Sequence, residues 1–151
     1  MNKIETRLIE LGIKLPEILT PIANYIPAKR AGNLVYTAGE VPVYNGKSYK
    51  GKLGLDITLE ESKTATKLCV VNCLAAIKSI CPLDKIKSVV AVHGLVNATP
   101  ENTEQADAMN GASDFIVEVF GEIGRHTRTA VSVGVPHNFV ASIYIIVEVE
   151  D

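Results

Sequence analysis

The residues around Arg128 are the ones in this chain whose types and spacing could do chemistry. Arg128 stands at the head of an alternating run, about 126–135, that predicts a β-strand with one apolar face and one face of small residues such as Ala130. A guanidinium with small neighbours has space in front of it, and its planar fork pairs with a carboxylate through two parallel hydrogen bonds. The pattern indicates a pocket for a small carboxylate, and it fits an intramolecular salt bridge to Asp114 or Glu118 equally well.

Other residue types that often carry catalysis are scattered along the chain. The sequence has no GxGxxG, GxSxG or HExxH motif and no Asp/Glu-rich cluster, so it predicts no metal site. Of the three histidines, His93 lies in an apolar run, where we expect a hydrogen-bonded ring, and His137 follows Pro136 in a turn, where we expect it solvated. The cysteines form no CxxC pair, and we expect buried, reduced thiols at Cys69, Cys73 and Cys81.

Composition and charge exclude several classes of partner. The 151 residues are 47% hydrophobic and only 5% aromatic, an aliphatic composition that favours a compact core or an oligomer with buried faces. The net charge of −2 gives no field that would attract nucleic acid or an anionic membrane. No run approaches the ~20 apolar residues of a membrane span, and the first residues lack a signal core. We therefore expect one cytoplasmic domain, 1–151, with neither nucleic acid nor membrane as partner.

Three helices are predicted from periodicity and capping signals. A short amphipathic helix covers 3–11 and ends at Gly12. Thr58 and Glu61 fit a capping box, which begins a long helix to about Ile80. The face of this helix expected in the core consists of Ala65, Cys69, Cys73, Ala76, Ile77 and Ile80. The pair Thr99-Pro100 predicts the start of another helix, which continues to about Phe120.

Five strands complete the prediction, with the polar, glycine-rich segment 44–57 as a loop. The expected strands are 25–29, 33–43, 86–96, 126–135 and 139–149. The order ββαβαββ favours an α+β domain, an antiparallel-rich sheet with two main helices packed on one face. The other face of the sheet carries aliphatic side chains, and oligomerisation would bury it.

Several segments resemble, in their order and spacing, the Rid (YjgF-like) family, and within it a divergent bacterial subgroup. The resemblance covers the chain from Pro21 onward. The segments are Ala23-Asn24-Tyr25, Gly32 to Pro42, Asn110-Gly111-Ala112-Ser113-Asp114, Val119-Phe120-Gly121-Glu122 and Gly124 to Val131.

This resemblance implies a fold, an assembly and an activity. The fold is chorismate-mutase-like, and the assembly is a homotrimer with a cleft between each pair of subunits. The activity is hydrolysis of reactive 2-imino or 2-enamino acids to 2-keto acids and ammonia, without metal or organic cofactor. Arg128 would hold the substrate carboxylate, Tyr25 would form a wall of the cleft, and the turn Thr37-Ala38-Gly39 would line it together with Ala130.

The chain departs from the family pattern at the catalytic position. Ser142 stands where the deaminases have a glutamate, Ala38 where they have a serine, and Ala130 where a cysteine is common. A hydroxyl can orient water but is a poor base near neutrality. Two hypotheses follow: a deaminase in which Ser142 or a backbone carbonyl holds the water, or a protein that binds a small carboxylate without catalysis. An RNA-directed activity is less favoured, because the chain has no basic groove or interleaved aromatic residues.

Overall fold

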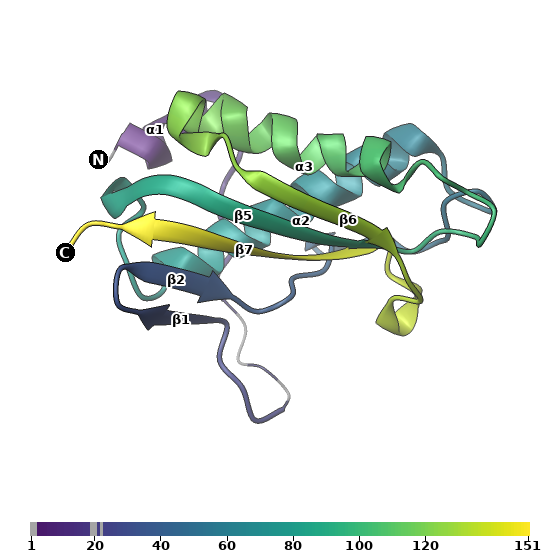
Figure 1. Ribbon diagram of the computed structural model, residues 1–151, viewed down its shortest axis with the longest axis horizontal. Helices are drawn as coiled ribbons and strands as arrows, with labels where there is room; N and C mark the ends of the chain where they lie inside the picture. Colours follow the sequence, from purple (N-terminus) through teal and green to yellow (C-terminus); the bar gives the residue numbers. More distant parts are fainter. Residues whose placement is uncertain (1–2, 19–20, 22) are drawn as a thin grey trace.

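A five-stranded mixed sheet is the centre of the molecule (Figure 1). The computed structural model describes residues 3–18, 21 and 23–151. The strand order is β1-β2-β7-β5-β6, and all neighbours pair antiparallel except β5 and β6, which are parallel. The strands are β1 (Ala28–Ala31), β2 (Leu34–Thr37), β5 (Ile86–Val96), β6 (Thr127–Ser132) and β7 (Ala141–Val149). The α+β class is confirmed, and β5 lies inside the sheet between β7 and β6.

The two long helices, α2 (Leu59–Lys78) and α3 (Gln105–Phe120), lie on one side of this sheet, as predicted (Figure 1). Thr58 caps α2 through the reciprocal bonds of a capping box with Glu61, which confirms the predicted start. The predicted buried face of α2 is confirmed except at Ile80, which lies beyond the end of the helix and is exposed. The short helix α1 (Lys3–Glu10) ends before Gly12, whose φ of 76° suits glycine.

The predicted start of α3 at Thr99-Pro100 is wrong, because that segment is held by contacts other than helical ones. The Thr99 backbone N–H donates to the Leu53 carbonyl at 2.9 Å, and the Asn102 side chain accepts from the Glu104 N–H at 2.9 Å. In a helix beginning at Pro100 the Glu104 N–H would donate to the Pro100 carbonyl, so its bond to Asn102 competes with that helix. The helix therefore begins only at Gln105.

The predicted strands also differ from the observed ones at their ends. Strand β1 begins three residues later than expected, and β2 ends at Thr37, followed by an isolated bridge between Glu40 and Ile143. The predicted loop 44–57 contains part of a hairpin, β3 (Val43–Tyr44) and β4 (Lys47–Ser48). Asn45 and Gly46 form its turn with φ of 52° and 76°, the Asn-Gly signature of a tight hairpin that the sequence carried.

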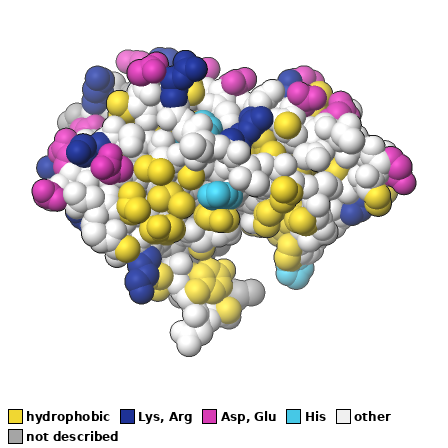
Figure 2. All heavy atoms as spheres, viewed as in Figure 1, with side chains coloured by type: hydrophobic (Ala, Val, Ile, Leu, Met, Phe, Trp, Pro, Cys, Tyr) yellow, Lys and Arg dark blue, Asp and Glu magenta, His cyan; other side chains and the backbone are white. Residues whose placement is uncertain are grey.

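The sheet face turned away from the helices is partly apolar. Tyr36, Val131 and Tyr144 remain 36–42% exposed there, and the His93 ring stacks on Tyr144 with centroids 4.5 Å apart. Figure 2 shows hydrophobic side chains gathered on the molecular face that carries this side of the sheet. We call this surface the open sheet face. It matches the expectation of a second apolar face that association would bury.

Candidate functional site

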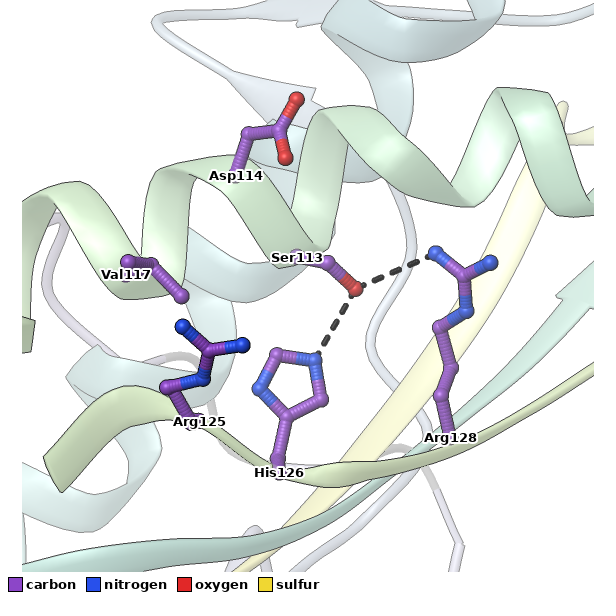
Figure 3. Close-up of a pocket in the computed structure, with 6 residues that line it drawn as sticks. All are labelled: Ser113, Asp114, Val117, Arg125, His126 and Arg128. Atoms are coloured by element: carbon purple, nitrogen blue, oxygen red, sulfur yellow. Dashed lines mark hydrogen bonds between the residues drawn. The ribbon is translucent and has the colours of Figure 1, made fainter. Parts of the chain in front are cut away.

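Arg128 lies in β6, at the edge of the sheet, and its side chain turns toward α3. Its Nη1 donates to Asn110 Oδ1 at 2.8 Å and to Ser113 Oγ at 3.3 Å, and both acceptors belong to α3. Among the described residues Arg128 forms no ion pair, so the alternative of a salt bridge to Asp114 or Glu118 is wrong. Figure 3 shows the Asp114 carboxylate pointing away from the guanidinium. The charge of Arg128 is therefore available to a ligand.

A surface pocket of about 420 Å³ opens beside Arg128, between α3 and the start of β6 (Figure 3). Two arginines give it a positive wall, since Arg125 lies along it together with Arg128. Arg125 also lies 4.0 Å from Glu122, a solvent-exposed pair that binds it only weakly. The lining residues are Ser113, Asp114, Val117, Arg125, His126 and Arg128.

Ser113 and His126 form a hydrogen-bonded pair in this pocket, which the sequence interpretation missed. Ser113 Oγ lies 2.9 Å from His126 Nε2, and His126 Nδ1 lies 2.6 Å from the Gly124 carbonyl oxygen. Because a carbonyl can only accept, Nδ1 carries the proton of the neutral ring and Nε2 accepts from the Ser113 hydroxyl. The sequence did contain one indication of the position of His126. Residues two apart in an extended segment share a face, so His126 is expected on the same face as Arg128.

Two glycines set the distance between α3 and its neighbours. A Cβ on Gly124 would lie 2.8 Å from the Ile116 carbonyl oxygen, so only glycine lets the turn before β6 approach α3 this closely. A Cβ on Gly111 would overlap the Lys63 backbone, so α3 also packs directly on α2. These close approaches fix Ser113 opposite His126.

A second group of predicted site residues lies around β2 and β7, which β5 separates from the strand of Arg128. Thr37 is buried, and its hydroxyl accepts from the Ile145 N–H at 3.0 Å and contacts Cys73 Sγ at 3.6 Å. The Ala38 N–H donates to the Pro27 carbonyl at 2.7 Å. Gly39 lies against Ser142, because a Cβ there would come within 2.8 Å of Ser142 Oγ. Gly39 and Ser142 therefore form one surface, which we call the Gly39 surface, whereas the Thr37 side chain is buried on the α2 side of the sheet, away from Ser142.

Glu40 adds a carboxyl group beside this surface that the sequence interpretation also missed. Its backbone exchanges hydrogen bonds of 2.8 and 3.0 Å with Ile143, which places its side chain on the α2 side of the sheet, opposite to Ser142. Burial raises the pKa of Glu40 to about 7. Burial likewise raises the pKa of the Cys69 and Cys73 thiols, both of which are free and buried.

One chain does not bring the two groups of predicted site residues together. Ser142 pairs with Leu95 of β5, and Leu95 pairs with Val131 of β6, so β5 separates Ser142 from the strand of Arg128. Ser142 also belongs to the open sheet face, whereas Arg128 and Ala130 face α3. Tyr25, which is 55% exposed, precedes β1 at the opposite edge of the sheet from β6.

Two kinds of feature are absent from the part of the chain that the structure describes. No group of three or more His, Cys, Asp or Glu side chains could hold a metal ion. None of the described helices is long and apolar enough to cross a membrane.

Comparisons with known proteins define the family. Residues 5–149 match the model of the family described as "YjgF/chorismate_mutase-like, putative endoribonuclease". A solved protein of unknown function from Agrobacterium tumefaciens is 41% identical, with a TM-score of 0.90 over 97% of this chain and 93% of that one. A solved protein from Shewanella oneidensis MR-1 is 35% identical, with a TM-score of 0.93 over 98% of this chain and 100% of that one. It is described as a "putative endoribonuclease".

A curated relative, Protein TCP17 of Trypanosoma cruzi, is 36% identical over 87% of this chain and 84% of its own length. The chain therefore belongs to the YjgF/chorismate mutase-like family, which confirms the resemblance to the Rid family and the chorismate-mutase-like fold. Members of this family are typically oligomeric.

Proposed function

We propose that this protein hydrolyses reactive 2-imino and 2-enamino acids to 2-keto acids and ammonia, with Arg128 holding the substrate carboxylate. The observation that carries the proposal is the state of Arg128. Only its Nη1 is occupied, by the neutral groups of Asn110 and Ser113, and its other nitrogens have no hydrogen bond to a described residue. A guanidinium oriented by neutral acceptors can pair with a carboxylate without first breaking an ion pair.

The active assembly in this proposal is a homotrimer with its clefts between subunits. The two groups of predicted site residues lie on different strands of one sheet, Arg128 and Ala130 on the edge strand β6 and the others around β1, β2 and β7. A head-to-tail ring joins unlike surfaces of successive copies, so it would bring Arg128 of one copy to the Tyr25 and Gly39 surface of the next. The partly apolar open sheet face supports association, because burial would remove Tyr36, Val131 and Tyr144 from water.

Binding of a small carboxylate without catalysis is the second candidate, and Ser142 is the observation that favours it. This residue offers a neutral hydroxyl in place of the family's glutamate. Losing a general base costs typically 10²–10⁴-fold in rate. A pocket with an intact anchor and a weakened base could serve to sense or carry a 2-keto acid.

An imine-hydrolysis assay tests the proposal. An amino-acid oxidase generates 2-imino acids in situ, semicarbazide traps them, and added protein competes for the imine. We expect the wild-type protein to reduce trapping and the Arg128→Ala protein to have no effect. No reduction with any of several imines would contradict the deaminase proposal. Binding of pyruvate by the same inactive protein would then favour the carboxylate binder, and cleavage of RNA would support the description that the family carries.

A further inference from the structure

We infer that Ser113 and His126 are positioning residues, which hold the Arg128 guanidinium in one orientation and leave its Nε–Nη2 edge turned outward for the substrate carboxylate. The inference rests on the proposed role of Arg128 as the carboxylate anchor, and it adds the residues that orient this anchor. Neither residue has to touch the substrate. The deaminase and the carboxylate binder both depend on the anchor, so the inference applies to either.

The Arg128 guanidinium is held at one of its nitrogens. Nη1 carries two N–H groups and has two acceptors, Asn110 Oδ1 at 2.8 Å and Ser113 Oγ at 3.3 Å. Because the guanidinium is planar, two bonds at Nη1 fix the plane of the group and the direction of its Nε–Nη2 edge. Figure 3 shows the other terminal nitrogen, Nη2, turned away from Ser113. The free Nε and Nη2 therefore present the parallel N–H groups that pair with a carboxylate on the side away from α3.

His126 determines which way the Ser113 hydroxyl points. The Gly124 carbonyl oxygen, 2.6 Å from His126 Nδ1, can only accept, so the neutral ring carries its proton on Nδ1 and a lone pair on Nε2. The Ser113 hydroxyl donates its one proton to Nε2, at 2.9 Å. A lone pair of Ser113 Oγ is then left for Arg128, which can only donate. Without the ring, the hydroxyl would be free to rotate away from this arrangement.

The pair is fixed by close packing, whereas Arg128 by itself is not. Ser113 lies in α3, and the turn that carries His126 approaches this helix so closely that a Cβ on Gly124 would lie 2.8 Å from the Ile116 carbonyl oxygen. Arg128 is a long, exposed side chain whose rotamers would otherwise exchange. Ordering such a side chain on binding costs about twofold to tenfold in affinity, and prior orientation removes that cost.

Binding of pyruvate, measured by isothermal titration calorimetry, is the first test. We expect Ser113→Ala to raise the Kd about threefold to tenfold, because Nη1 keeps only its bond to Asn110. His126→Ala should raise the Kd by a similar or smaller factor, and Ser113→Thr, which keeps a hydroxyl, should stay within about twofold of wild type. Ser48→Ala is the matched control with an unchanged Kd, since Ser48 is exposed in β4, outside the main sheet.

An Arg128→Lys background separates positioning from a purely structural role. A lysine ammonium has no planar fork to orient, so adding Ser113→Ala to Arg128→Lys should change the pyruvate Kd less than about twofold. A structural role would lower the affinity equally in both backgrounds. NMR of the arginine side chains gives a readout that needs no ligand: rotation about the Cζ–Nη1 bond of Arg128 should be slow in wild type and faster in Ser113→Ala.

The outcomes distinguish the inference from the proposed function. An unchanged Kd in Ser113→Ala, with unchanged rotation at Arg128 Nη1, would overturn the inference, as would an equal loss of affinity in the Arg128 and Arg128→Lys backgrounds. A wild-type protein that binds pyruvate but hydrolyses no imine would contradict the deaminase proposal, and the expected pattern of Kd values would still support the inference.

Discussion

Replacement of Arg128 is the perturbation with the best-defined consequence. The side chain is exposed, and it contributes two hydrogen bonds to neutral groups of α3. Exposed substitutions away from caps and cores usually change the free energy of unfolding by less than about 0.5 kcal/mol. We therefore expect Arg128→Ala to fold normally and to keep the oligomeric state of the wild-type protein.

The expected loss of ligand binding is much larger than the loss of stability. Each hydrogen bond to a charged group contributes about 1.5–3 kcal/mol, and a carboxylate would make two with the free edge of the guanidinium. Even the lower figure for a single bond, about 1.5 kcal/mol, raises the Kd about tenfold, and loss of both raises it at least 100-fold. Arg128→Lys keeps the charge without the fork, so its Kd should fall between those of wild type and Arg128→Ala.

Isothermal titration calorimetry with pyruvate measures these Kd values, and light scattering measures the mass of the assembly. Acetamide, which has the size of a small carboxylate without its charge, is the control ligand and should bind none of the three proteins. An unchanged Kd in Arg128→Ala would refute the anchor. Dissociation of the assembly in this variant would show that Arg128 serves the interface instead of the pocket.

Three further predictions concern other residues. The pKa of Glu40 is about 7 in the folded protein and 4.5 as the ordinary value. The contribution of protonated Glu40 to the free energy of unfolding should therefore be complete below pH 4.5 and should be lost as the pH rises toward and through 7. Ionisation of Glu40 in the folded protein would cost at most roughly 3 kcal/mol, and about 1–2 kcal/mol after screening at a partly accessible side chain. The Glu40→Gln protein should therefore unfold at a higher urea concentration than wild type at pH 8 and at the same urea concentration at pH 4. Equal shifts of the urea midpoint at both pH values would contradict this. Ser142→Glu should raise imine hydrolysis at least tenfold by adding a carboxylate to the Gly39 surface, and a fall in rate in a folded protein would contradict the two-sided cleft. Tyr144→Asp on the open sheet face should lower the mass measured by light scattering, and a mass unchanged at micromolar concentration would show that this face is not buried by association.

The fold was largely predictable because its strongest local signals agree with its tertiary contacts. The capping box at Thr58 gave the start of α2 to the residue, and the apolar run 86–96 gave β5 with its observed bounds. The start of α3 was not predictable from Thr99-Pro100, because the Asn102 side chain takes the Glu104 N–H that such a helix would use, and because Thr99 is bonded to Leu53, 46 positions earlier. A local capping pattern cannot report such a contact.

The candidate site was predictable in part. Arg128 and its small-residue face follow from the alternation of one strand, and the structure places Arg128 beside α3 in the wall of a pocket. The Ser113–His126 pair joins a helix to a strand, and its distance depends on the close approaches at Gly111 and Gly124. Likewise, the burial that raises the pKa of Glu40 depends on the packing of α2 beside the bridge to Ile143.

The central claim is that Arg128 of one copy and the Gly39 surface of another form a single site, and mixing two inactive variants tests it most directly. Arg128→Ala removes the anchor, and Gly39→Val fills the space in front of Ser142. In a head-to-tail trimer each mixed ring holds one intact cleft, so equal, fully exchanged subunits should recover about a quarter of the wild-type rate of imine hydrolysis. Recovery near that value, from two variants that are each inactive alone and folded by circular dichroism, is the predicted result. No recovery after proven subunit exchange would contradict the claim and place the whole site within one chain.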